Sequence, residues 1–351
     1  LCNFLMNVKS IKFAENSMMK KLDTNLACQN LEEISLPDNI CEFGGSWCNE
    51  TPNLTKVKIS PKNKNLIFYE DKFLIGKSDT KSDIYDILYF ARRDIEEAII
   101  PSFIRIISPY AFNFCVKLQK VEFSGDSKLQ IIGESAFSYS SVASISIPKT
   151  VTTISCCAFA NCQLTDITFS EDSHLELIDN EAFNHSLLKT ISIPASVKKI
   201  GNSAFCDCSL LTEVNFSKNS KLKIIDDFSF NFSGLKKIEI PRSVIFIGDH
   251  SFADCRDLKE LDIYNDSELL YIGERAFSDS LIRRVFIPQK VIIINNGCFF
   301  NCANTHTVKF GENSHLRIIG NNAFTNCMFK QITIPSSVTQ IGECAFAYNT
   351  C

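Results

Sequence analysis

Apolar residues recur along this chain in short, regularly spaced runs separated by polar loops. In the run that begins at Leu188, apolar side chains alternate with polar ones through Ile191 and Ile193, a period of two that is typical of a β-strand with one buried face. Proline follows Ile193 directly, and proline ends a strand because it cannot donate to a neighbouring strand. A second short apolar run then leads to Gly201 and Phe205. We interpret this unit as one coil of a repeating structure.

The phenylalanine position repeats through most of the chain. Its intervals of 22 and 24 or 25 residues alternate, which indicates two coil types in a double unit of about 47 residues. The members of this series are Phe112, Phe137, Phe159, Phe183, Phe205, Phe230, Phe252, Phe277, Phe299, Phe324 and Phe346. The prolines that follow the strands have the same double period, at Pro101, Pro148, Pro194, Pro241, Pro288 and Pro335. Coils of this length bury their apolar side only against their neighbours, as in leucine-rich-repeat solenoids.

We therefore predict a leucine-rich-repeat-like solenoid of about 14 coils with one parallel β-strand per coil, connected by short turns or helical turns and curved into a right-handed superhelix. One column of turn residues contains glycine, as at Gly201 and Gly248, or Asp179, Asp226 and similar polar residues elsewhere. Glycine, Asp and Asn tolerate a positive φ, so we predict a turn at this column. Phenylalanine follows four residues later, and we expect a helical turn that places its ring in the core.

Residues 1–351 are predicted to form a single solenoid, because the N-terminal part carries the same pattern in a less regular form. The spacing breaks within residues 66–98, where two β-rich runs joined by a polar stretch predict a hairpin-type insertion in one coil. Its aromatic residues can either bind a partner or pack the hairpin against the solenoid, and we favour packing. The chain starts at Leu1 inside a repeat and stops at Cys351 just after one, so we expect both ends to be truncated.

Charge and hydropathy narrow the class of partner. The chain has 36 Lys and Arg against 40 Asp and Glu, a net charge of −4, and contains no long run of like charges. This balance argues against nucleic acid as a partner. We find neither a stretch of 18 apolar residues nor a secretory signal pattern, so the sequence predicts no membrane span in this chain.

The cysteines are the most conspicuous chemical groups, 16 in number. Five of them, three residues after the phenylalanine of alternate coils, are Cys115, Cys162, Cys208, Cys255 and Cys302. Equivalent Cα atoms two coils apart are separated by about 9.6 Å, beyond the roughly 7 Å limit of a disulfide, so we predict a packing column. Cys327, on the coil next to Cys302, is the exception that could form a disulfide in an oxidising compartment. Without metal-ligand spacing, a nucleotide-binding loop or an activated serine motif, we predict no metal, no cofactor and no enzyme.

The repeated motifs IPxSVxxIGxxAFxxC and FSxxSxLxxIGxxAFxxS resemble the leucine-rich repeats of BspA-like surface antigens. The resemblance covers nearly the whole chain, and the Lys-, Asn- and Ser-rich loops are closer to protozoan members. It implies a cell-surface or secreted protein that adheres to host matrix or cells, and it implies that the hairpin insertion is a family feature. The adhesive role and the location rest on this resemblance alone.

A partner would meet the strand face, where the central outward side chain of each strand forms a column. Phe286 is the aromatic outlier of this column, and charged residues surround it. We predict a partner-binding patch there, because aromatic residues with Arg are enriched at interface hot spots. Its candidate residues are Phe286, Arg284, Arg283, Asp262, Glu260, Glu239 and Lys309. The alternative, which we favour, is that these opposite charges only pair with one another across the strands.

The function predicted from these observations is recognition of a host or neighbouring-cell protein through the solenoid face. An intracellular protein-interaction scaffold is a first alternative, because many unpaired cysteines suit a reducing, cytoplasmic compartment. A repeat domain attached to a catalytic module outside this chain is a second.

Overall fold

The computed structural model describes residues 7–14 and 16–349, so that Leu1 and Cys351, the expected truncation points, lie outside the described residues. The chain divides into two compact units, unit 1 from Leu1 to Ile167 and unit 2 from Thr168 to Cys351. Each unit is built of short parallel strands joined by turns, and no α-helix occurs among the described residues. This architecture confirms the predicted parallel β-solenoid of about 14 coils.

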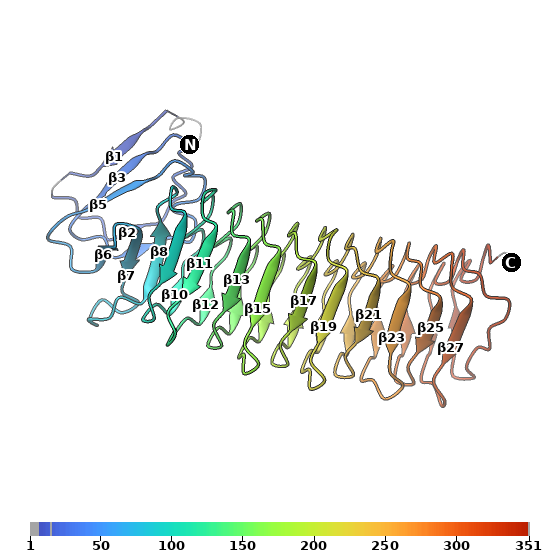
Figure 1. Ribbon diagram of the computed structural model, residues 1–351. Coiled ribbons are helices and arrows are strands. Elements are labelled where there is room, and N and C mark those ends of the chain that lie inside the picture. Colours follow the sequence, from blue (N-terminus) through green and yellow to red (C-terminus); the bar gives the residue numbers. More distant parts are fainter. Residues whose placement is uncertain (1–6, 15, 350–351) are drawn as a thin grey trace. The chain divides into compact units, whose positions relative to one another are not determined.

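The coils of unit 2 contribute long strands of four residues to one face (Figure 1) and short strands of two residues to another. The long strands are β17 (Thr190–Ile193), β19 (Glu213–Phe216), β21 (Lys237–Ile240), β23 (Glu260–Ile263), β25 (Arg284–Ile287) and β27 (Thr307–Phe310). The short strands are β16 (Leu177–Ile178), β18 (Lys199–Ile200), β20 (Ile224–Ile225), β22 (Phe246–Ile247), β24 (Tyr271–Ile272), β26 (Ile293–Ile294), β28 (Ile318–Ile319) and β29 (Gln340–Ile341). Pro194, Pro241 and Pro288 directly follow β17, β21 and β25, as the sequence predicts.

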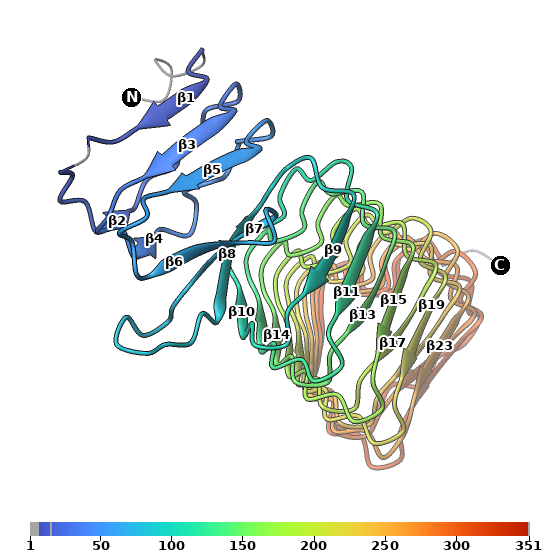
Figure 2. The same cartoon turned by 60° about the vertical axis from the view of Figure 1, so that its left-hand side comes forward.

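Unit 1 repeats this plan, and Figure 2 shows its short strands β10 and β14 on a different side of the coils from β9, β11 and β13. Its long strands are β1 (Ser10–Lys12), β3 (Glu33–Leu36), β5 (Lys56–Ile59), β9 (Glu97–Ile100), β11 (Lys120–Phe123) and β13 (Ser144–Ile147), while β15 (Asp166–Phe169) contains the boundary between the units. Its short strands are β2 (Lys21–Leu22), β4 (Glu42–Phe43), β10 (Ile106–Ile107), β12 (Ile131–Ile132) and β14 (Thr153–Ile154).

The irregular stretch of unit 1 is an antiparallel meander. Strand β6 (Leu66–Tyr69) pairs antiparallel with β7 (Phe73–Gly76), which pairs antiparallel with β8 (Ile87–Ala91), and β8 continues in parallel with β10. Phe73 and Phe90 are fully buried. The ring centroid of Phe73 lies 6.0 Å from that of Phe112, and the ring centroid of Phe90 lies 5.7 Å from that of Trp47. These contacts confirm that the aromatic residues pack the meander against neighbouring coils.

Stacked phenylalanines form the core of both units. In unit 2 every ring of the series from Phe183 to Phe324 is fully buried, and successive ring centroids are 5.1–5.3 Å apart with interplanar angles of at most 10°. In unit 1 Phe112, Phe137 and Phe159 stack in the same way, at 4.8 and 5.1 Å. Because this spacing is constant while the sequence intervals alternate between 22 and 25 residues, the loops accommodate the difference in coil length.

The segment that carries each phenylalanine is a series of turns rather than the expected helical turn. Around Phe230, the N–H groups of Asn231 and Ser233 donate to carbonyls three residues earlier, while those of Phe228, Phe230 and Phe232 donate to the next coil. Phe228 and Phe232 have φ of 55° and 54°, and the equivalent residues of the other coils are also positive. A left-handed residue at these two positions prevents a continuous helix and directs alternate N–H groups outward to the neighbouring coil.

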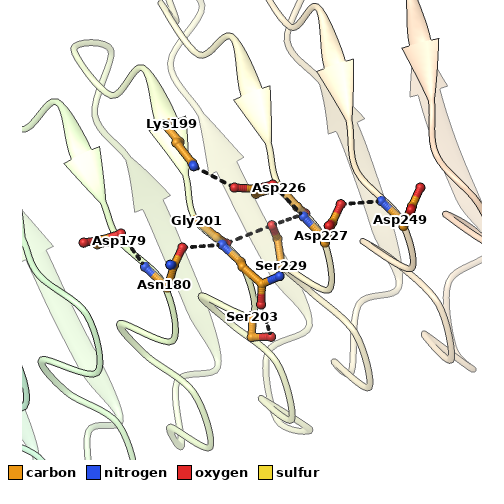
Figure 3. A network of polar contacts seen from close by, with 10 residues as sticks. Asp179, Asn180, Lys199, Gly201, Ser203, Asp226, Asp227, Ser229 and Asp249 are labelled. Atoms are coloured by element: carbon orange, nitrogen blue, oxygen red, sulfur yellow. Dashed lines mark hydrogen bonds and ion pairs between the residues drawn. The ribbon is translucent and has the colours of Figure 1, made fainter.

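A turn begins at the glycine column, where the Ala204 N–H donates to the Gly201 carbonyl, but among the described glycines only Gly297, outside this column, has a positive φ. Glycine is needed there for close approach. A Cβ atom on Gly201 would lie 2.6 Å from the backbone nitrogen of Asn180 on the preceding coil. The side chain of Asn180 accepts a hydrogen bond from the Asn202 N–H at 2.9 Å, and Asp227 accepts likewise from Asp249 at 2.8 Å (Figure 3). The column therefore brings neighbouring turns together so that these polar side chains can bridge them.

Candidate protein-binding face

The long strands of unit 2 present a regular face to solvent. In β21, Ile238 and Ile240 point into the core while Lys237 and Glu239 are exposed, and β17 and β23 show the same alternation. The alternation follows from the pleat, which turns successive side chains to opposite faces of the sheet. Only the outward residues are available to a partner.

The long strands of unit 2 are paired in doublets and do not form one continuous sheet. β17 pairs with β19, β21 with β23 and β25 with β27, each over four residues, and the doublets belong to separate sheets. Paired strands start 23 residues apart, whereas β19 and β21, or β23 and β25, start 24 residues apart. Just before β25 the N–H of Arg283 still donates to the Lys259 carbonyl at 3.2 Å, and the strands then part. One extra residue in the connecting loop therefore coincides with an open edge.

A surface hollow lies at each of three such openings. The hollow between β19 and β21 has a volume of about 460 Å³, that between β23 and β25 about 760 Å³, and that between β27 and residues 331–336 about 590 Å³. Their linings include both the outward-facing and the inward-facing residues of the flanking strands, such as Arg284 and Val285 at the hollow beside β25. The strand face of unit 2 is thus grooved once per double coil.

Four of the seven predicted patch residues line the largest of these hollows, namely Asp262, Arg284, Phe286 and Lys309, while Glu239 lines the hollow between β19 and β21. Arg284 and Phe286 lie on the same side of β25, and Phe286 stands opposite Lys309 in the register of β27. Glu239 and Asp262 are opposite each other in the doublet β21–β23, and Asp262 lines the same hollow as Phe286. Phe286, which we expected to be exposed, is half-buried and lines this hollow.

The acidic residues of the patch already have partners. Lys237 lies 2.8 Å from Asp262 and 3.7 Å from Glu260, and the hydrogen bond to Asp262 raises the pKa of Lys237. The hydroxyl of Tyr264 donates to Glu239 at 2.6 Å, which raises the pKa of Tyr264. These groups are exposed, so water and salt screen each contact and it contributes little to stability. Mutual charge pairing therefore accounts for the β21–β23 half of the patch.

The cationic half of the patch is different. Among the residues that the structure describes, Arg283, Arg284 and Lys309 form no ion pair, and Arg283 and Arg284 are exposed. Sequence reasoning missed Tyr264, which lies beyond the column of central strand residues, lines the hollow and packs under the Arg242 guanidinium at 3.7 Å. The site thus combines an aromatic floor with cations that have no protein partner.

The buried thiols contribute packing. Cys208, Cys255 and Cys302 are fully buried, and each donates to the carbonyl of the phenylalanine on the preceding coil at 3.2 Å. Ser186, Ser233 and Ser280 share a hydrogen bond with these thiols. Burial raises the pKa of Cys208 to about 11, and of Cys255 and Cys302 to about 12, which makes them poor nucleophiles at neutral pH.

Cys302 and Cys327, the pair that the sequence allowed to form a disulfide, are both free thiols. Within the part of the chain that the structure describes, no three His, Cys, Asp or Glu side chains are grouped so as to hold a metal ion. No described helix has the length and apolar character that crossing a membrane requires.

Solved structures support the fold. A leucine-rich-repeat protein from Bacteroides ovatus is similar over 97% of this chain and 85% of its own, with 20% identity and a TM-score of 0.60. The pneumococcal vaccine antigen PcpA is similar over 82% of this chain and 74% of its own, with 22% identity and a TM-score of 0.53. At these identities the likeness shows the architecture alone. Among curated proteins the sequence finds no match.

A family model confirms the resemblance seen in the repeated motifs. The BspA-type leucine-rich-repeat region, a model of 6 copies, matches residues 3–73, 82–140, 130–233 and 223–351. These segments include both coil types and both units. The chain therefore belongs to the BspA-type leucine-rich-repeat family.

Proposed function

We propose that this protein is displayed at a cell surface or secreted, and that it binds a host or neighbouring-cell protein through the strand face of unit 2. The observation that carries the proposal is the hollow between β23 and β25, lined by Phe286, Arg284 and Lys309. An aromatic side chain beside an arginine in a partly closed pocket has the character of an interface hot spot. Leucine-rich-repeat folds present such extended faces for protein binding.

Two features of the hollow favour a protein partner. Two aromatic side chains that line it, Tyr264 and Phe286, can contact an incoming apolar side chain. The hollow lies where β23 and β25 are not paired with each other, so the outward side chains on its two sides come from separate sheets. Arg284 offers a planar fork for a carboxylate or a carbonyl of the partner.

The surface location is supported by a structural neighbour and by the family resemblance. PcpA, which shares the fold at a TM-score of 0.53, is described as a pneumococcal vaccine antigen. Exposure on intact cells is tested by labelling unpermeabilised cells with antibodies against this chain. Labelling that appears only after permeabilisation would favour the intracellular scaffold, which the free thiols of the described residues also suit.

Binding through the patch is tested with beads coated with the purified chain and presented to cultured host cells. We expect the double variant Phe286→Ala with Arg284→Ala to lose at least about tenfold in apparent affinity, the effect of a typical hot spot. The matched control is Phe232→Ala with Arg256→Ala, an exposed aromatic and an exposed arginine of unit 2 outside the long strands. Circular dichroism checks that both variants are folded.

An unchanged affinity in the Phe286/Arg284 variant would contradict the proposal. Equal losses in both variants would also contradict it, because they would show binding that does not depend on the strand face.

A further inference from the structure

A row of basic side chains runs across the coils of unit 2, one residue before the long strands. The row, which we call the basic ridge, consists of Lys189, Lys236, Lys259, Arg283 and His306, with Thr212 between the first two. The overall charge of −4 conceals it, because the basic residues come from different repeats and meet only in the solenoid. No acidic residue occupies this position from Lys189 to His306.

Backbone hydrogen bonds place the ridge residues on successive coils. Thr212 donates to Lys189 at 2.9 Å, Lys236 to Thr212 at 3.3 Å and Lys259 to Lys236 at 3.0 Å. Arg283 then donates to Lys259 at 3.2 Å, and His306 to Arg283 at 3.0 Å. The ladder is continuous even where the strands part a residue later. With adjacent strands about 4.8 Å apart, its five steps span about 24 Å.

The ridge charges have no partner within the protein. All five basic side chains are exposed, and none forms an ion pair among the described residues. The nearest acidic residues in sequence are Glu213, Asp257 and Glu260, and Glu260 already lies 3.7 Å from Lys237. Like charges at the spacing of adjacent coils repel one another, and an anionic ligand would relieve that repulsion.

The geometry favours a linear polyanion over an acidic peptide. Side chains on one face of an extended peptide recur every 6.6–6.8 Å or so, which falls out of step with cations about 4.8 Å apart. A sulfated polysaccharide carries several anionic groups on each repeat and requires no such register. Lys, which provides three of the five basic residues of the ridge, binds as a point charge without a fixed planar geometry.

A single-stranded nucleic acid fits less well, because its bases need aromatic platforms beside the cations. The residues one position after the ridge residues are Thr190, Glu213, Lys237, Glu260, Arg284 and Thr307. The residues two positions before the ridge residues are Leu187, Leu210, Gly234, Asp257, Leu281 and Asn304. None of these flanking residues is aromatic.

We propose that the basic ridge is a binding site for a linear sulfated polysaccharide. The site adjoins the Phe286–Arg284 patch at Arg283 but does not depend on it. A ligand on the ridge crosses the coils at the start of the long strands, whereas the hollow beside Phe286 lies farther along them. One surface can therefore bind both a glycan and a protein.

The proposal is tested with heparin as the probe, by measuring its affinity for the purified chain as a function of salt. The ridge variant is Lys236→Glu with Lys259→Glu. The control is Lys218→Glu with Lys221→Glu, which makes the same change in net charge at exposed loop positions of unit 2. We expect the ridge variant to bind heparin at least about tenfold more weakly, with a shallower dependence on salt because fewer counterions are released.

Three results would overturn the proposal. An equal loss in the control variant would show general attraction by net charge. Displacement of heparin by poly-glutamate at equal charge concentration would show that the ridge prefers acidic protein. Tighter binding of single-stranded DNA than of heparin would assign the ridge to nucleic acid.

Discussion

Glycine in the turn column acts through the absence of a side chain, not through its backbone freedom. At Gly248, an added Cβ would lie 2.5 Å from the backbone nitrogen of Asp227 on the preceding coil. The positions that do adopt positive φ carry residues as large as Phe228, Phe232 and Tyr139. Such conformations cost free energy for residues with a side chain, and the stacked coils impose them because alternate N–H groups must reach the next coil.

Replacing Gly248 by alanine is therefore expected to reduce the free energy of unfolding by about 2 kcal/mol, as backbone atoms of the neighbouring coil cannot yield easily. The control is Gly125→Ala, because nothing lies within 4 Å of a Cβ atom at Gly125. That change should be neutral or slightly stabilising. Urea denaturation of both variants measures the effect, and equal stabilities would show that close approach does not constrain the column.

The phenylalanine stack is the element that holds successive coils together. Phe230 is fully buried between Phe205 and Phe252, with ring centroids at 5.1 and 5.2 Å, while Phe232 in the same turn is 46% exposed. Phe230 and Phe232 are only two positions apart, yet only Phe230 belongs to the stack. The difference in burial accompanies a difference in backbone conformation, since Phe232 has a φ of 54° and Phe230 does not have a positive φ.

We expect Phe230→Ala to lower the free energy of unfolding by about 3–5 kcal/mol, because removal of the buried ring leaves a cavity between its two neighbours in the stack. Phe232→Ala, in the same turn, should change stability little. Native-state hydrogen exchange is the suitable measurement, since each coil contacts chiefly its neighbours and the loss should concentrate in the coils next to residue 230. Uniform loss across unit 2 would contradict this nearest-neighbour view.

At the scale of the whole molecule, the buried thiols make the stability of each unit depend on pH. Burial raises the pKa of Cys48 in unit 1 to about 11, and those of Cys208, Cys255 and Cys302 in unit 2 to about 11 or 12, from an ordinary value of 9.0. An unfolded chain would lose these protons at lower pH than the folded one. Their stabilising contribution is thus complete below pH 9 and disappears as pH rises toward 12.

The triple variant Cys208→Ser, Cys255→Ser and Cys302→Ser should show a flatter decline of stability between pH 9 and pH 11 than the unmodified chain. Serine already occupies the equivalent place on alternate coils, at Ser186, Ser233 and Ser280, so the variant is expected to fold. Urea midpoints at several pH values measure the difference. Parallel pH profiles would show that the thiols do not titrate with unfolding.

The parallel solenoid, the buried phenylalanine series, the strand ends at proline and the thiol packing column all followed from the residue pattern. These features depend on local periodicity. A strand with a period of two and a ring at a fixed interval become buried whenever similar coils stack on one another. The family also followed from the motifs. The coil and the side on which each patch residue lies also followed from the residue pattern, because its position in the column determines both, whereas its role in binding stays a prediction.

The strand doublets, the hollow beside Phe286 and the basic ridge depended on the tertiary structure. The 23- and 24-residue steps between strands are present in the sequence, yet only stacking shows that the longer step opens the edge. Contacts between coils also determine which cations are paired. Asp262 forms its ion pair with Lys237 of the neighbouring coil and not with Arg284. Periodicity specifies how a coil is built, whereas contacts between coils decide which surface groups remain available to a partner.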